Sequence, residues 1–204
     1  MDILNFNFPR HHSFKEDFLI SFIVMGLAIS IAYGRIIHGY APEKFLFILL
    51  PAGILSSLMA FALNYLSTNF VANRYGIRVN YTLYTSGIIV ALITSIFGFI
   101  ISLPGSTGLI TSGNKDIDGK IAISGPLANM TAGLGISGYL FFTSGPLKLV
   151  LLILSSSNLL VAVLSSLPIP PLVGFTILKW NFYIYLIFLS FSIAFLAVLG
   201  QGFI

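Results

Sequence analysis

The ionisable side chains that could bind a metal ion or transfer a proton lie outside the apolar segments of this sequence. The 204 residues contain no cysteine. The three histidines and six acids all fall in predicted tails or loops: His11, His12, His38, Asp2, Glu16, Asp17, Glu43, Asp116 and Asp118. Zinc binding needs imidazole, thiolate or carboxylate ligands, and hydrolysis needs a general base. We therefore expect neither a conventional metal site nor a hydrolytic centre within the apolar segments.

Two polar side chains, Asn64 and Thr68, lie close to the end of a long apolar segment. They are four residues apart, so both project from one face of the predicted helix. Histidines at this spacing, with a glutamate after the first, bind zinc and activate water. Here the amide of Asn64, the phenol of Tyr65 and the hydroxyl of Thr68 occupy those three places, and none of these groups does that work.

Three further motifs give the sequence a resemblance to a known family. They are Phe-Val-Ala-Asn-Arg-Tyr-Gly at residues 70–76, Gly-Pro-Leu-Ala-Asn at residues 125–129, and Pro-Ile-Pro-Pro-Leu-Val-Gly at residues 168–174. With these motifs the chain resembles the site-2 protease family of intramembrane zinc metalloproteases, and in particular its compact archaeal and bacterial members. The resemblance implies descent from a zinc-dependent endopeptidase.

The resemblance also implies which positions carried the chemistry. Family members have His-Glu-x-x-His where this sequence has Asn64, Tyr65 and Thr68, and Val173 stands in place of the Asp that supplies their third zinc ligand. Ser165 stands in place of an Asn in the family. An amide, a hydroxyl and an isopropyl group bind zinc poorly. We therefore predict that zinc is lost, that no metal is bound and that no catalytic residues remain.

The polar residues left at and near these positions predict a different kind of site. Asn64 and Thr68 belong to the second predicted membrane span, Asn129 to the fourth, and Asn158 and Ser165 to the fifth. Buried amides in lipid need hydrogen-bond partners. We therefore expect these residues to form a hydrogen-bonded polar cluster where the family has its metal.

The composition is typical of an integral membrane protein. Apolar residues make up 57% of the chain and charged residues only 8%, with a mean hydropathy of +1.00. The formal net charge of +4 is small and spread between apolar segments, which argues against a nucleic-acid partner. We expect a multi-pass protein of the cell membrane whose partners are the lipid bilayer and other transmembrane proteins.

The apolar segments predict an all-α membrane fold of about six transmembrane helices, with a site-2-protease-like core. A polar N-terminal tail at residues 1–17 precedes a single transmembrane domain at residues 18–204. The predicted spans cover residues 18–34, 45–73, 86–103, 121–142, 147–167 and 181–199. Residues 76–84 alternate between polar and apolar, which predicts a short β segment near the membrane interface. With six spans, the Lys and Arg residues divide five and five between the two sides, so charge does not orient the protein.

Two functions fit these predictions. The protein is either a pseudoprotease that binds transmembrane segments of client proteins without cutting them, or an accessory or structural subunit of a larger membrane complex. The alternative is an active intramembrane zinc metalloprotease with atypical ligands. A serine mechanism lacks a base beside Ser155–Ser157 or Ser165–Ser166, and transport would need ionisable residues within the spans.

Overall fold

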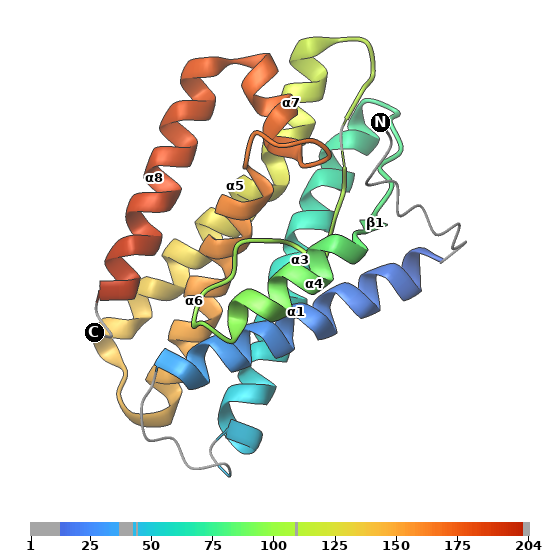
Figure 1. The fold of residues 1–204 in the computed structure, drawn as a ribbon. Coiled ribbons are helices and arrows are strands. Elements are labelled where there is room, and N and C mark those ends of the chain that lie inside the picture. Colours follow the sequence, from blue (N-terminus) through green and yellow to red (C-terminus); the bar gives the residue numbers. More distant parts are fainter. Residues whose placement is uncertain (1–12, 37–42, 44, 109, 202–204) are drawn as a thin grey trace.

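Long helices packed side by side make up most of the fold (Figure 1). The computed structural model describes residues 13–36, 43, 45–108 and 110–201. The tail predicted at residues 1–17 lies mostly outside this range, as do His11, His12 and His38. In chain order the elements are α1 (Phe14–Ile36), the π-helical turn η1 (Phe45–Leu49), α3 (Leu50–Arg74), β1 (Thr82–Leu83), α4 (Thr85–Ser95), β2 (Gly105–Ser106), α5 (Lys115–Tyr139), the 3₁₀ turn η2 (Leu140–Phe142), α6 (Gly145–Ser165), α7 (Val173–Trp180) and α8 (Phe182–Gln201).

Within the residues that the structure describes, four helices are long and apolar enough to cross a membrane. They cover Phe14–Arg35, Phe45–Arg74, Gly145–Ser165 and Phe182–Leu199. A helix rises about 1.5 Å per residue and the hydrocarbon core is about 30 Å thick, so each is long enough. The spans predicted at residues 18–34, 45–73, 147–167 and 181–199 are thus helices of the expected kind. The predicted number of six spans is not confirmed.

Helix α5 differs at both ends from the span predicted at residues 121–142. The Asn114 side chain accepts hydrogen bonds from the backbone amides of Asp116 (3.0 Å) and Ile117 (3.3 Å). Such a cap satisfies amides that have no partner within the helix, so α5 begins at Lys115. The helix ends at Tyr139 and tightens into η2. The segment before α5 is therefore shorter than the predicted spans implied, and residues 103–107 within it are buried.

The third predicted span, at residues 86–103, is not one helix, and this prediction was wrong. Helix α4 has only 11 residues, or about 16 Å of length. It ends because Gly98 adopts φ +89°, a left-handed conformation open to glycine. The amides of Gly98 and Phe99 then bond back to the carbonyls of Ser95 and Thr94, which closes the helix end.

A pair of short antiparallel strands brings the chain back after α4. Thr82 pairs with Ser106 and Leu83 with Gly105, and the backbone amide of Tyr84 donates to the Pro104 carbonyl at 2.7 Å. The β segment predicted at residues 76–84 is therefore confirmed at its end, with a partner strand that was not predicted. Because the residues before and after α4 are paired, the segment between them enters and leaves at one level instead of crossing.

Neighbouring long helices run antiparallel and approach closely through small residues. Hydroxyls bond between long helices at several places. Ser57 Oγ donates to the Phe22 carbonyl (2.7 Å), Ser124 Oγ to that of Ser67 (3.4 Å) and Ser155 Oγ to that of Gly133 (2.7 Å). Small side chains and hydroxyl bonds of this kind hold helices together in lipid, where the hydrophobic effect does not. These contacts join α1 to α3, α3 to α5, and α5 to α6.

Replacing Gly87 by Ala should destabilise the protein by about 1–3 kcal/mol, because an added methyl group overlaps the Leu103 backbone. Thermal unfolding in detergent would show a lower Tm. Gly135→Ala is the matched control, since Gly135 is exposed on α5 and has nothing within 4 Å of an added Cβ. Alanine favours a helix over glycine by about 1 kcal/mol, so this variant should be at least as stable as the native protein. Equal Tm values for the two variants would contradict the close packing of α4 on the returning segment.

Candidate functional site

Asn64 and Thr68 face the first residue of the Gly-Pro-Leu-Ala-Asn motif. A Cβ placed on Gly125 of α5 would lie 2.9 Å from Asn64 Oδ1 and closer still to Thr68 Oγ1. Only glycine therefore allows α5 to approach α3 at this point. The structure thus brings together two positions that the sequence analysis singled out separately.

The five residues of the predicted polar cluster are all buried. The hydroxyls bond within their own helices: Thr68 Oγ1 donates to the Asn64 carbonyl at 2.8 Å and Ser165 Oγ to the Val161 carbonyl at 2.7 Å. The Asn158 side-chain amide likewise donates along α6, to the Leu154 carbonyl at 2.8 Å. In the described part of the chain these bonds therefore run along each helix and do not join the five side chains to one another.

Several buried amide atoms have no hydrogen-bond partner in the described residues. They include both side-chain polar atoms of Asn129, the nitrogen of Asn64 and the oxygen of Asn158. Asn129 lies one turn from Gly125, which contacts α3, and one turn from Gly133, which contacts α6. Asn129 is therefore placed where three helices meet. Each unsatisfied buried group costs about 1–3 kcal/mol.

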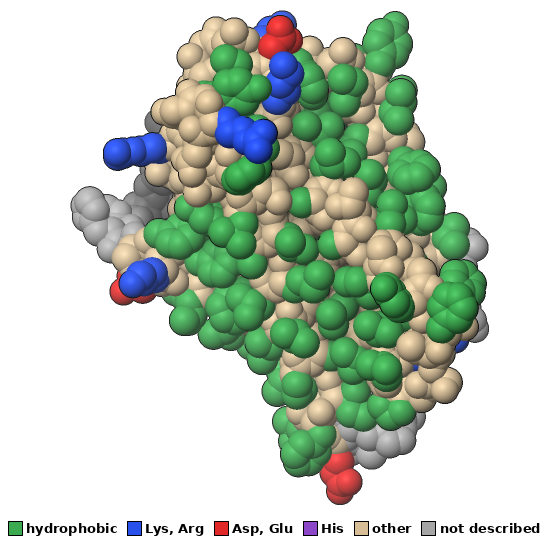
Figure 2. Space-filling model, turned by 180° about the vertical axis from the view of Figure 1, so that it is seen from behind, with side chains coloured by type: hydrophobic (Ala, Val, Ile, Leu, Met, Phe, Trp, Pro, Cys, Tyr) green, Lys and Arg blue, Asp and Glu red, His purple; other side chains and the backbone are tan. Residues whose placement is uncertain are grey.

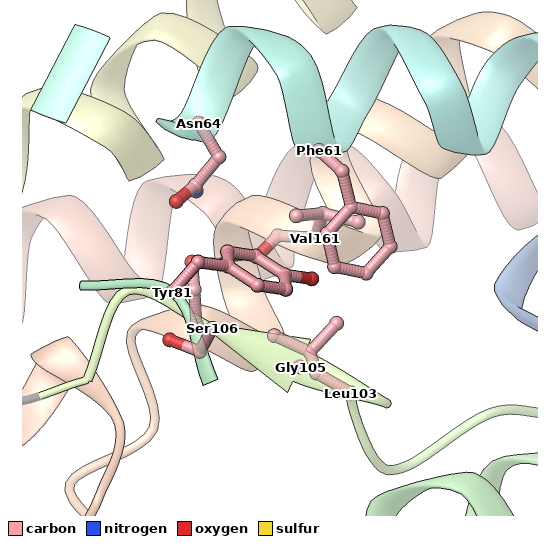
Figure 3. Close-up of a pocket in the computed structure, with 8 residues that line it drawn as sticks. Phe61, Asn64, Tyr81, Leu103, Gly105, Ser106 and Val161 are labelled. Carbon is pink, nitrogen blue, oxygen red and sulfur yellow. Dashed lines mark hydrogen bonds between the residues drawn. The ribbon is translucent and has the colours of Figure 1, made fainter. Parts of the chain in front are cut away.

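Asn64 and Ser165 share a small cavity (Figure 3). Its volume is about 10 Å³, and its lining consists of Phe61, Asn64, Tyr81, Leu103, Gly105, Ser106, Val161 and Ser165. In Figure 3, Asn64 and Phe61 extend from α3 toward the Tyr81 ring, with Gly105 and Ser106 below it. A cavity of this size holds one water molecule and nothing larger. Burial raises the pKa of the Tyr81 phenol, which therefore stays neutral.

Tyr65 and Val173 take part in packing. The Tyr65 ring lies 4.7 Å from that of Phe14 and 6.3 Å from that of Tyr81, between centroids, in an aromatic group against α1. Val173 begins α7 and is almost fully buried. It belongs to an apolar cluster formed by Ala72, Val79, Ile110, Ile121, Ala122, Val173, Ile177 and Tyr185. Val173 offers no polar atom, and the ring of Tyr65 is held among other aromatic rings.

The donor groups at these positions do not fit zinc. The Thr68 hydroxyl is bonded to a backbone carbonyl, Val173 offers only carbon, and the Asn64 amide is uncharged. Tetrahedral zinc needs charged or imidazole ligands to replace its water. The residues for which the structure gives positions include no group of three His, Cys, Asp or Glu side chains that could hold a metal ion.

A larger groove of about 240 Å³ lies near the small cavity and was not predicted from the sequence. It is lined by Tyr84, Ser86 and Gly87 at the start of α4, by Ile101, Ser102 and Leu103 of the returning segment, and by Leu164, Leu167, Ile169, Pro170, Pro171 and Leu172. Its walls come from segments far apart in the chain, so no local pattern marks it. The prolines at residues 168–171 were the one available signal, because they must break the helix.

One wall of the groove carries unpaired backbone. In the part of the chain that the structure describes, the amides and carbonyls of residues 100–103 make no hydrogen bonds. These residues follow α4 without forming part of a helix or a strand. Ile101 is exposed and Ser102 half-buried, whereas Ile100 and Leu103 are buried and the Leu103 carbonyl lies against Gly87.

Comparison with curated proteins gives one relative at a distance. Over 121 residues the chain is 33% identical to a protein of Methanocaldococcus jannaschii described as "Putative zinc metalloprotease". The matched part covers 57% of this chain and 63% of that protein, so less than two thirds of the relative is represented. No protein-family description matches the chain. No solved structure matches it either.

Replacing Asn129 by Leu should stabilise the protein by about 1–3 kcal/mol, because an apolar side chain of similar size removes two unsatisfied buried atoms. Thermal unfolding in detergent measures the change. Thr68→Val is the control: it removes a satisfied hydroxyl and should cost about 0.5–1.5 kcal/mol. If Asn129→Leu instead lowers the Tm, the amide has a partner in the protein's native setting.

Proposed function

We propose that this protein is a catalytically inactive homologue of the site-2 intramembrane metalloproteases that binds segments of other membrane proteins without cutting them. In this proposal it is a multi-pass protein of the cell membrane with a site-2-protease-like core. The distant match to a protein described as a zinc metalloprotease supports the ancestry. The three motifs that carry the resemblance support it independently.

The chemistry of Asn64, Thr68 and Val173 supports the loss of activity. The Asn64 side chain is an uncharged amide, and the Thr68 hydroxyl donates to a backbone carbonyl of its own helix. Val173 is an apolar side chain within an apolar cluster. Without zinc, no bound water has its pKa lowered toward neutrality. The described residues include no group of three His, Cys, Asp or Glu side chains that could hold a metal ion in its place.

The observation that carries the binding role is the unpaired backbone of residues 100–103 along the groove. Backbone groups without partners are costly in a bilayer, because no water is present to bond them. An extended client segment can pair with such an edge, while the groove accommodates its side chains. The sequence predicts a β segment at residues 76–84. In the structure Thr82 and Leu83 are already paired with β2, so the returning segment replaces them in this proposal.

A photo-reactive residue placed in the groove should capture client segments. We expect Ile101→benzoylphenylalanine to give crosslinks to transmembrane proteins, because Ile101 lines the groove and is 55% exposed. The control is the same residue at Ile187 of α8, which is 70% exposed and lies away from the groove lining. Mass spectrometry of the crosslinked products identifies the partners.

Equal protein crosslinking at Ile101 and Ile187 would contradict a client groove. One partner captured in fixed ratio from Ile187 alone would indicate the accessory-subunit function instead. Crosslinks from Ile101 to several membrane proteins, with little from Ile187, would agree with the proposal.

Metal analysis tests the loss of activity. Purified protein should contain far less than one zinc per chain and should not cleave transmembrane peptides, because its donor groups do not suit the ion. Asn64→Ala and Thr68→Val should leave both measurements unchanged. Stoichiometric zinc that disappears in either variant would establish the alternative of an active protease with atypical ligands.

A further inference from the structure

The basic side chains gather at one end of the molecule. Of the eight Lys and Arg residues that the structure describes, six lie toward the end where α3 finishes: Lys15, Arg74, Arg78, Lys115, Lys120 and Lys179. Arg35 and Lys148 lie toward the opposite end. Figure 2 shows Lys and Arg mostly in the upper part of the rear face, above a broad apolar surface.

Contacts between helices fix this arrangement. Ser124 of α5 bonds to Ser67 of α3, so the start of α5 and the end of α3 lie at the same end. The Trp180 indole donates to Asp116 at 3.1 Å, which places the end of α7 beside the start of α5. An apolar cluster that includes Ala72, Ile121 and Ile177 packs these three helices together.

Helix α4 explains why the sequence did not predict this asymmetry. If residues 86–103 crossed the membrane, Lys115, Lys120 and Lys179 would lie on the side opposite Arg74 and Arg78. That arrangement gives the division of five and five Lys and Arg residues that six spans predict. Because Thr82–Leu83 pairs with Gly105–Ser106, the chain returns before α5 begins. The lysines of α5 and α7 therefore join the arginines near the end of α3.

We infer that this basic end faces the cytoplasm and that its side chains bind the headgroups of anionic phospholipids. Short loops that remain in the cytoplasm carry an excess of Lys and Arg, whereas acids contribute little to orientation. The cytoplasmic leaflet carries anionic lipids that attract basic residues beside membrane spans. Trp180, partly exposed at this end, is a residue type found at the membrane interface. The inference rests on the membrane location in the proposed function but not on client binding.

Among the described residues this end carries six basic and four acidic side chains, an excess of two positive charges; Glu16 and Asp17 lie beside Lys15, and Asp116 and Asp118 lie at the start of α5. Asp116 accepts the Trp180 indole hydrogen bond, and Asp118 accepts one from the Ser112 backbone amide at 2.8 Å. Both carboxylates are therefore held in local bonds within the start of α5. Lys115 and Lys120, by contrast, are exposed.

Cysteine labelling tests the orientation, since the native chain has no cysteine. Asn73→Cys and Ser112→Cys place thiols at the basic end, and Ser144→Cys places one at the other end; all three positions are exposed. With a membrane-impermeant maleimide, Ser144→Cys should react in intact cells. The other two variants should react only after permeabilisation.

Reaction of Asn73→Cys and Ser112→Cys in intact cells would overturn the inference. Reaction of only one of them would mean that Asn73 and Ser112 lie on opposite sides of the membrane. The chain would then cross between these residues instead of returning through α4, and the inference depends on that return. Either result leaves the Ile101 crosslinking test unaffected, so failure here is distinguishable from failure of the proposed function.

Lipid binding tests the headgroup contact. Native mass spectrometry of protein from vesicles of phosphatidylglycerol in phosphatidylcholine should show retained phosphatidylglycerol. Replacing Lys115, Lys120 and Lys179 by Ala should weaken that retention roughly tenfold or more. Lys148→Ala, at the opposite end, is the control and should have little effect. Equal retention by the triple variant and the control would overturn the lipid contact.

Discussion

The antiparallel pairing of Thr82–Leu83 with Gly105–Ser106 is the interaction on which the rest of this structure depends. It holds both ends of the α4 segment at one level, so the chain turns back instead of crossing. Helix α5 then begins beside the end of α3, and Gly125 comes to lie against Asn64 and Thr68. The same turn leaves an extended segment along the groove. A few backbone hydrogen bonds thus determine the contents of the site and the distribution of charge between the two ends.

Burial in an apolar interior imposes a second constraint: every polar side chain needs hydrogen-bond partners. Hydroxyls and amides differ in how easily one helix supplies them. A Ser or Thr hydroxyl can donate to a carbonyl one turn earlier in its own helix, as Thr68 and Ser165 do. It therefore adds little cost to a membrane helix. An Asn side chain has both donors and an acceptor, and one helix does not satisfy them all. Among the described residues this difference accounts for four of the eight unpartnered buried side-chain atoms, those of Asn64, Asn129 and Asn158; the other four belong to Asp17, Tyr81, Thr107 and Ser157.

Much of the fold could be predicted from the sequence because apolar runs of membrane length have few other stable forms. The same reasoning failed at residues 86–103, because an apolar sequence of this kind is compatible with a helix that crosses the membrane and with a segment that turns back. What distinguishes the two forms is the left-handed backbone at Gly98 and a strand pair that joins residues more than twenty positions apart. Neither appears in local periodicity.

The candidate site was predictable in part, for a similar reason. Helical spacing placed Asn64 and Thr68 on one face, and the motif glycine at 125 lies against that face. The sequence predicted hydrogen bonds between the polar side chains, whereas the hydroxyls of Thr68 and Ser165 donate to competing carbonyls in their own helices. The groove was also beyond prediction, since its walls come together only through tertiary packing.

The two neighbouring cavities differ in what they leave unsatisfied, and this contrast supports the proposed binding role. The small cavity at Asn64 suits a single water molecule, and the described side chains that line it are uncharged. Ionisable ligands without their metal would be costly at that depth. Along the groove, by contrast, the main chain of residues 100–103 makes no hydrogen bond to the residues that the structure describes. Recognition through main-chain pairing needs neither zinc nor a base, so the proposed loss of the catalytic groups is compatible with the proposed binding of an extended segment.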